Sequence, residues 1–201
     1  MARPFILGLT GSIGMGKSTT ASLFAQRGIP VHDADAAVRR LYAAEGAGAR
    51  LIADLFPDAV AKDGSVDRAR LRDHVLGRPD SLARLEAAIH PLVRAEEQRF
   101  LDDHADASLV ILDIPLLFET GGEGRCDAVL VVTADPEVQR QRVLARPGMS
   151  EATLAAILAK QMPDADKRAR ADFLIDTGLG LAGAENQVDA LIEQLADTGP
   201  A

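Results

Sequence analysis

The sequence predicts an α/β fold with a five-stranded parallel sheet. Its strongly apolar runs are short and alternate with longer stretches of helical periodicity, the pattern of parallel strands joined by crossover helices. Aromatic residues are few and Trp is absent, so the interior must be built from Ala, Leu, Ile and Val, which suits helices packed on such a sheet. The expected strands lie at residues 5–9, 29–33, 108–114, 127–133 and 173–175.

The first strand leads into a glycine-rich loop. Residues 11–18, GSIGMGKS, fit the pattern G-x-x-x-x-G-K-[ST], and residues 19–26 read as a helix. Strand, glycine loop and helix in this order form a cradle in which backbone N–H groups and the positive end of the helix dipole face a phosphate group. Lys17 would reach the β- and γ-phosphates and the Ser18 hydroxyl would bind Mg²⁺. The chain is therefore predicted to bind a nucleoside triphosphate with Mg²⁺.

Two acids follow the second strand, which begins after the helix-ending Gly28. Asp33 and Asp35 lie at the carboxyl end of a parallel strand, where such sheets bind ligands. Asp35 could simply be the N-cap of a helix over residues 36–44. An N-cap role accounts for one of the two acids but less well for both. We therefore expect at least one of them to accept the proton of an attacking hydroxyl group or to orient Mg²⁺.

Residues 36–108 read as mostly helical. Apolar spacing predicts helices over 50–56, from Ser65 or Asp67 onward, and over 82–103. The last of these contains His90-Pro91, and an internal proline removes a hydrogen bond and kinks or breaks a helix. From the residues alone, a simple break between two core helices is favoured over a kink that forms a pocket wall with Arg94.

The third strand, residues 108–114, ends in Asp113 and is stopped by Pro115. An acid at the end of such a strand is expected to bind Mg²⁺ through its water shell. The fourth strand is followed by Asp135-Pro136, an N-cap with proline in the first helical turn. The fifth precedes Asp176-Thr177-Gly178, and an amphipathic helix over 181–195 closes the chain.

The segment between the last two strands is locally basic although the chain is acidic. Arg140, Arg142 and Arg146 fall within seven positions that contain no acid. A solvated charged face is the usual explanation for such a cluster. The functional alternative is a lid whose arginines close over the triphosphate and neutralise the charge of the moving phosphoryl group.

Composition limits the other possibilities. The 201 residues allow one domain, or one core with appendages, and the net charge of −8 argues against nucleic-acid binding. Cys126 is the only cysteine, so an internal disulfide is excluded and a reducing compartment fits. No signal peptide is apparent and no apolar run approaches the ~20 residues of a membrane helix. We therefore expect a cytoplasmic protein with neither nucleic-acid nor membrane partners.

The order of these motifs resembles the dephospho-CoA kinase family over residues 5–178. The segments that carry the resemblance are LTGSIGMGKS, VHDAD, IHPLV, DIPLLFE, DAVLVV with its arginine helix, and QMPDADKRARADFLIDTG. The resemblance implies a three-layer P-loop fold of the nucleoside-monophosphate-kinase type. It also implies transfer of the γ-phosphate of ATP to the ribose 3′-hydroxyl of dephospho-CoA, the last step of coenzyme A synthesis. Independently of the resemblance, we expect a monomer.

The same resemblance assigns regions and residues. It implies one kinase domain, 1–201, with a core of 1–35, 109–136 and 171–201, a helical acceptor-binding part of 36–108 and a lid of 137–170. The catalytic residues would be Asp35 as first choice for the general base, Asp33 as second, Lys17 and Arg142. ATP would be bound by Gly11, Ser12, Ile13, Gly14, Met15, Gly16, Lys17, Ser18, Thr19, Arg142, Arg146, Thr177 and Gly178. The acceptor would contact Asp35, His90, Pro91, Arg94, Leu116, Leu117 and Glu119, and Mg²⁺ would contact Ser18 and Asp113. The chain has Thr177 where many members have Asn.

Two other readings stay open at this point. One is another small-molecule kinase of the shikimate type, which also has paired acids after its loop, although the long helical insertion favours a larger acceptor. The other is a non-catalytic nucleotide-binding switch. A GTP-dependent switch needs an N-K-x-D segment, which the sequence lacks.

Overall fold

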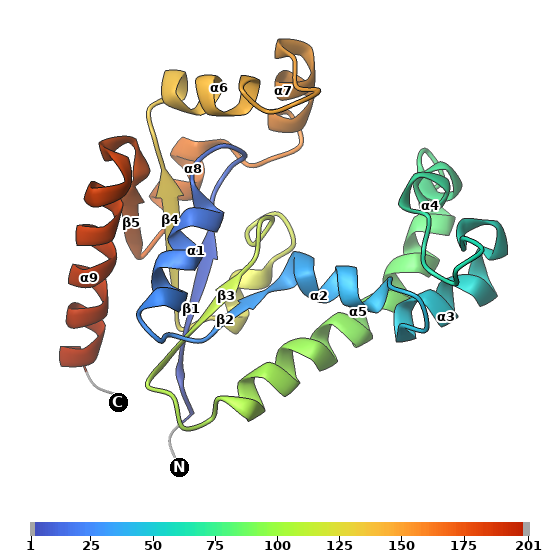
Figure 1. Cartoon of the computed structure of the whole chain (residues 1–201), viewed down its shortest axis with the longest axis horizontal. Coiled ribbons are helices and arrows are strands. Elements are labelled where there is room, and N and C mark those ends of the chain that lie inside the picture. The colour runs from blue at the N-terminus through green and yellow to red at the C-terminus, as the bar shows by residue number, and fades with distance from the viewer. Residues whose placement is uncertain (1–2, 199–201) are drawn as a thin grey trace. The chain divides into compact units, whose positions relative to one another are not determined.

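The computed structural model describes residues 3–198 (Figure 1). The chain divides into two compact units. The first comprises residues 1–32 and 104–201, and the second comprises residues 33–103. Within the described residues, no helix is both long and apolar enough to cross a membrane.

A five-stranded sheet forms the centre of the first unit, in the order β2-β3-β1-β4-β5. The strands are β1 (Phe5–Thr10), β2 (Val31–Asp33), β3 (Leu109–Asp113), β4 (Ala128–Thr133) and β5 (Phe173–Asp176). The neighbours β1–β3, β1–β4 and β4–β5 pair in parallel. This confirms the predicted α/β class with a five-stranded parallel sheet.

The strand sequences explain why this sheet is covered on both faces. All five residues of β3 are buried, as are most of those in β1 and β4. Near-continuous apolar runs are typical of parallel strands with helices on both sides. β2 is shorter than predicted because Pro30 precedes it and has no N–H, although the Pro30 carbonyl accepts a hydrogen bond from Ile111 N at 2.9 Å.

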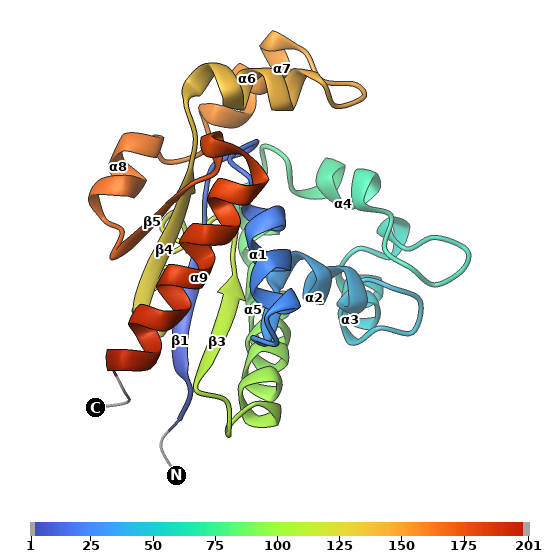
Figure 2. The same ribbon diagram turned by 60° about the vertical axis from the view of Figure 1, so that its left-hand side comes forward.

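Two helices pack side by side on one face of the sheet, α1 (Lys17–Gln26) and α9 (Gly180–Thr198) (Figure 2). Their apolar side chains form one core with the strands, and Phe24 and Val188 within it are fully buried. An ion pair between Arg27 and Asp189 joins the two helices at the surface. α1 begins two residues before the predicted start, because Gly16 occupies its N-cap position.

Three helices lie between β4 and β5, in the predicted lid segment. They are α6 (Pro136–Leu144), α7 (Glu151–Leu158) and α8 (Asp164–Ala169). Asp135 is the N-cap of α6, as predicted, and its carboxylate accepts a hydrogen bond from Glu137 N at 2.8 Å. Short 3₁₀ turns follow β3 and β5, at η2 (Gly122–Arg125) and η3 (Thr177–Leu179).

The second unit is helical, as predicted, and has a core of its own. It contains α2 (Ala34–Leu41), α3 (Ala47–Leu55), the 3₁₀ turn η1 (Pro57–Ala59), α4 (Arg68–Val75) and α5 (Pro79–Asp103). The core includes Ile52, Phe56, Leu71 and Ile89. α4 starts after Asp67, whose carboxylate accepts hydrogen bonds from Ala69 N and Arg70 N, so the second of the two predicted starts is correct.

In this unit one prediction made from the residues alone is wrong, and the alternative that made Asp35 an N-cap does not hold. α5 is one helix of 25 residues with Pro91 inside it, so the favoured break at His90-Pro91 does not occur. Ile89, Leu92 and Val93 pack against the core of the unit, and this packing holds the helix together across the missing hydrogen bond. The N-cap of α2 is Asp33 and not Asp35, because the helix begins at Ala34, two residues earlier than predicted.

The core of the first unit gives a direct stability prediction. Replacing Phe24, which is 0% exposed, with Ala should lower the free energy of unfolding by about 3–5 kcal/mol, because a large cavity would remain between α1 and the sheet. Urea denaturation followed by circular dichroism measures this change. The control is Gln26→Ala on the exposed face of α1, for which we expect a change within about 0.5 kcal/mol. A loss below about 1 kcal/mol for Phe24→Ala would contradict the described packing.

Candidate functional site

The glycine-rich loop connects β1 to α1 at the point where the sheet order reverses. β1 lies between β3 and β4, and the chain reaches β2 and β3 on one side before β4 and β5 on the other. Open α/β sheets bind ligands at the carboxyl ends of strands beside such a switch point. Residues 11–16 occupy this position, and Met15 N donates to the Ser12 carbonyl at 3.1 Å to close a turn within them.

Gly14 and Gly16 give the loop its shape. Their φ angles are 80° and 90°, a left-handed region that residues with a Cβ rarely adopt. Both also pack closely on neighbours. A Cβ on Gly14 would lie 2.6 Å from a methyl carbon of Val143 in α6, and one on Gly16 would lie 2.9 Å from the Thr177 hydroxyl oxygen. The loop therefore depends on glycine at these positions for both conformation and space.

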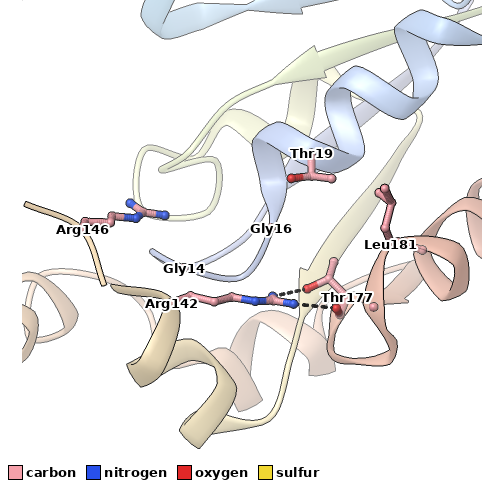
Figure 3. A pocket seen from close by; sticks show the side chains of 9 residues that line it. Gly14, Gly16, Thr19, Arg142, Arg146, Thr177 and Leu181 are labelled. Atoms are coloured by element: carbon pink, nitrogen blue, oxygen red, sulfur yellow. Dashed lines mark hydrogen bonds between the residues drawn. The ribbon is translucent and has the colours of Figure 1, made fainter. Parts of the chain in front are cut away.

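A pocket of about 340 Å³ opens beside the loop (Figure 3). Its lining comes from the loop and α1, from α6 and the residues just after it, from η3, and from the start of α9. The lining residues are Gly14, Gly16, Thr19, Arg142, Arg146, Thr177, Gly180, Leu181 and Ala184. The structure thus brings together six of the residues predicted on the nucleotide side. Leu181, which is 58% exposed, adds an apolar wall that the sequence did not predict.

Arg142 and Thr177 are joined across this pocket. The two terminal nitrogens of Arg142 donate to the Thr177 hydroxyl oxygen at 2.8 Å and to its carbonyl oxygen at 2.7 Å (Figure 3). The same hydroxyl donates to the Met15 carbonyl at 2.8 Å, and Thr177 is buried. Thr177 therefore connects the loop to α6, and its hydroxyl is engaged within the protein. Arg146 is exposed and lies two residues after the end of α6.

Lys17 and Asp113 form an ion pair at the carboxyl end of the sheet. The Lys17 ammonium lies 2.7 Å from a carboxylate oxygen of Asp113, and both side chains are largely buried. Ser18 is exposed in the first turn of α1. The Ser18 hydroxyl and the Asp113 carboxylate are oxygen donors of the kind that Mg²⁺ prefers, so the residues present fit this ion. Among residues 3–198, no three His, Cys, Asp or Glu side chains gather into a metal site.

The remaining nucleotide-side residues lie around the same loop. Gly11, Ser12 and Met15 are buried, and Gly178 N donates to the Asp176 carboxylate at 2.7 Å. Ile13 is half-buried and contacts two glutamine side chains, Gln139 and Gln161.

Glu119 follows β3 and forms an ion pair with the fully buried Lys167. Lys167 in α8 is 0% exposed, and its ammonium lies 2.8 Å from Oε1 of Glu119. Met162 N donates to the same oxygen at 2.8 Å. Burial alone would raise the pKa of Glu119, but the contact with the Lys167 ammonium and the hydrogen bond from Met162 N outweigh it, so the pKa lies below its ordinary value. Nearby, Leu117 is fully buried and Leu116 is 42% exposed.

The other predicted acceptor-side residues belong to the second unit. Oδ1 of Asp33 accepts from Ala36 N at 2.8 Å, and Oδ2 accepts from Arg39 at 3.2 Å. Asp35 is exposed in the first turn of α2. His90, Pro91 and Arg94 are exposed on α5, and His90 and Arg94 share one face of this helix because they are four residues apart.

The sequence model of a protein family described as dephospho-CoA kinase matches residues 5–182 of this chain. The chain belongs to the dephospho-CoA kinase family. A dephospho-CoA kinase of Mesorhizobium japonicum is 62% identical, with 94% of this chain and 96% of the relative covered. One of Cereibacter sphaeroides is 57% identical, with 99% and 100% covered. The crystal structure of TT1252 from Thermus thermophilus has a TM-score of 0.84 at 40% identity and covers 97% of this chain and 98% of that one.

Membership of the dephospho-CoA kinase family confirms the resemblance seen in the sequence. It leaves the roles of individual residues as predictions. Sequence reasoning missed Lys167, which stands among charged residues in DADKRAR and carries no sign of burial. It also missed Leu181, because an apolar residue at the start of an amphipathic helix is ordinarily part of the core.

The Lys167–Glu119 pair makes a pH prediction. A carboxyl group with a lowered folded pKa stabilises the fold above its unfolded pKa of about 4.3, and this stabilisation is lost as pH falls through the folded pKa. In Lys167→Met the burial of Glu119 would remain but the neighbouring ammonium group would be lost. We therefore expect the Glu119 pKa to rise above its ordinary value, so that this carboxyl destabilises the fold at neutral pH.

Carbon-detected NMR titration of the Glu119 carboxyl group measures this pKa directly. Lys160→Met, at an exposed position in the same segment, is the matched control and should leave it unchanged. A Glu119 pKa in Lys167→Met equal to that of the parent protein would contradict the described pair.

Proposed function

We propose that this chain transfers the γ-phosphoryl group of ATP to the ribose 3′-hydroxyl of dephospho-CoA, giving coenzyme A and ADP as the last step of coenzyme A biosynthesis. The observation that carries the proposal is the glycine loop at the switch point of the sheet, with Arg142 and Arg146 beside it, in a chain of the dephospho-CoA kinase family. Such a site suits phosphoryl transfer, which depends mainly on positioning and on charge stabilisation.

The nucleotide would lie along the loop. Backbone N–H groups within residues 11–19, other than those of Ile13 and Met15, and the positive end of α1 would hold the β- and γ-phosphates. Lys17 would exchange part of its contact with Asp113 for the phosphate oxygens. Arg142 and Arg146 would neutralise charge that develops on the transferred group. The adenine and ribose would extend toward Thr177, Gly178 and the apolar side chain of Leu181.

Ser18 and Asp113 are the residues that would hold Mg²⁺. When bound, the ion neutralises charge on the phosphate oxygens during transfer. Because the Asp113 carboxylate lies 2.7 Å from the Lys17 ammonium, the ion or its water shell would lie beside this pair.

Asp35 would accept the proton of the attacking 3′-hydroxyl. Its carboxylate is exposed and is not the N-cap of α2, whereas Asp33 already accepts from Ala36 N and Arg39. An uncommitted carboxylate is the better proton acceptor, which supports Asp35 over Asp33.

The residues expected to contact the acceptor lie within the helical insertion and in the segment that follows it. His90, Pro91 and Arg94 would contact it from α5, and Leu116 and Glu119 from the loop after β3. Leu117 would contribute only through packing, since it is fully buried. Glu119 would offer Oε2, because Oε1 accepts from Lys167 and Met162 N.

We further propose a cytoplasmic monomer without nucleic-acid or membrane partners. The net charge of −8 supports the absence of nucleic acid. Sedimentation equilibrium should give the mass of a single chain.

Acceptor-dependent ADP release tests the proposed function. Purified protein with Mg²⁺–ATP should release ADP when dephospho-CoA is added and should form a product that is heavier by one phosphoryl group. Shikimate and adenosine serve as control acceptors and should stimulate no release. ADP release without dependence on dephospho-CoA, in protein that binds ATP, would contradict the proposed acceptor.

The general base makes a separate prediction. Asp35→Asn should lower kcat by about 10²–10⁴-fold and leave the KM for ATP unchanged, because only the proton acceptor is lost. Asp54→Asn, on the exposed surface of α3, is the matched control and should keep normal turnover. Near-normal turnover in Asp35→Asn, together with a large loss in Asp33→Asn, would assign the base to Asp33 instead.

A further inference from the structure

Two glutamines hold the peptide groups on either side of Ile13 in the glycine loop. Nε2 of Gln139 donates to the Ile13 carbonyl at 2.7 Å, and Oε1 of Gln161 accepts from Ile13 N at 3.1 Å. Gln139 lies in α6 and is 7% exposed, and Gln161 lies between α7 and α8. One amide thus acts as donor and the other as acceptor toward the same residue of the loop.

We propose that Gln139 and Gln161 are positioning residues that fix the two peptide planes beside Ile13 and so orient the Gly14 N–H group toward the phosphates of the nucleotide. The proposal rests on the proposed function, because an anion in the loop is what gives the direction of these N–H groups its importance. Neither glutamine needs to touch the nucleotide. Each acts through the peptide plane that it holds.

The orientation follows from the planarity of the peptide bond. The described chain contains no cis peptide bond, so the Ile13 carbonyl and the Gly14 N–H point in opposite directions within one plane. When Gln139 holds the carbonyl toward α6, the Gly14 N–H is turned away from Gln139. Gly14 lines the pocket, so an N–H group of the loop is fixed there before any ligand arrives.

The preceding peptide is fixed in the same way. Gln161 holds the Ile13 N–H, so the Ser12 carbonyl points to the opposite side, where it accepts from Met15 N at 3.1 Å. With both planes set and a left-handed glycine following, the direction of the Gly14 N–H group is set by contacts within the protein.

The amide side chains of Gln139 and Gln161 have the hydrogen-bonding groups that this positioning role requires. The group at residue 139 must donate to a carbonyl, and the amide does so without adding charge beside the phosphates. A carboxylate there would repel both the carbonyl and the anion. Gln161 is held in turn by its neighbour, because Met162 N donates to Glu119. The buried Lys167–Glu119 pair therefore supports the position of Gln161.

Substitution at residue 139 tests the proposal. Gln139→Met keeps the length of the side chain and removes the donor, so the Kd for the Mg²⁺ complex of the non-hydrolysable analogue AMPPNP should rise about fivefold to tenfold, as expected for one lost hydrogen bond. Calorimetry measures the Kd. The ¹⁵N–¹H resonance of Gly14 should shift, and its further change on AMPPNP binding should shrink.

Gln141→Met is the matched control. It makes the same chemical change on the same helix, at an exposed side chain that contacts Glu137, and should leave both readouts unchanged. Gln139→Glu should weaken binding more than Gln139→Met, because it adds repulsion to the lost donor. Gln161→Met, at a half-buried position, should also raise the Kd, and it carries the test if a variant at residue 139 does not fold.

The outcomes separate this proposal from a merely structural role and from the proposed function. A lowered melting temperature with an unchanged Kd and an unchanged Gly14 resonance would overturn it. All binding measurements are made without dephospho-CoA, so a failure of the acceptor assay would leave the positioning role standing. A parent protein that does not bind Mg²⁺–AMPPNP would overturn both.

Discussion

A triphosphate is recognised through oxygens that need several N–H donors pointing into one hollow. The loop after β1 can supply them because Gly14 and Gly16 adopt φ angles of 80° and 90°. Such a conformation has a high conformational entropy cost, since glycine is the most flexible residue in the unfolded chain. The surrounding structure must therefore hold the loop, and the site depends on the contacts that do so.

Those contacts come from segments far along the chain. The Thr177 hydroxyl binds the Met15 carbonyl, while Gln139 and Gln161 bind both polar groups of Ile13. Gln139 and Gln161 lie between β4 and β5, and Thr177 directly follows β5. The predicted lid segment therefore carries Arg142 and also holds the conformation of the glycine loop through Gln139 and Gln161.

Much of the fold could be predicted from local patterns, since buried parallel strands are continuous apolar runs and the loop motif has a fixed spacing. The errors came from effects that are not local. Asp33 and Asp35 are both acceptable N-caps, and only the start of α2 distinguishes them. Pro91 stays inside α5 because the core of the second unit holds that helix. Lys167 reads as a surface charge, and its burial depends on Glu119, 48 positions earlier in the sequence. The roles of the catalytic residues stay predictions.

The central claim is that the loop after β1 binds the triphosphate, and a nucleotide titration followed by ¹⁵N–¹H NMR tests it most directly. Added Mg²⁺–AMPPNP should shift the amide resonances of residues 11–19 most strongly, followed by those near Arg142 and Thr177. The contradictory result is an undisturbed loop with the largest shifts elsewhere. A pocket of about 400 Å³ lined by Phe118, Cys126 and Arg170 is the clearest alternative location, and shifts centred there would refute the account.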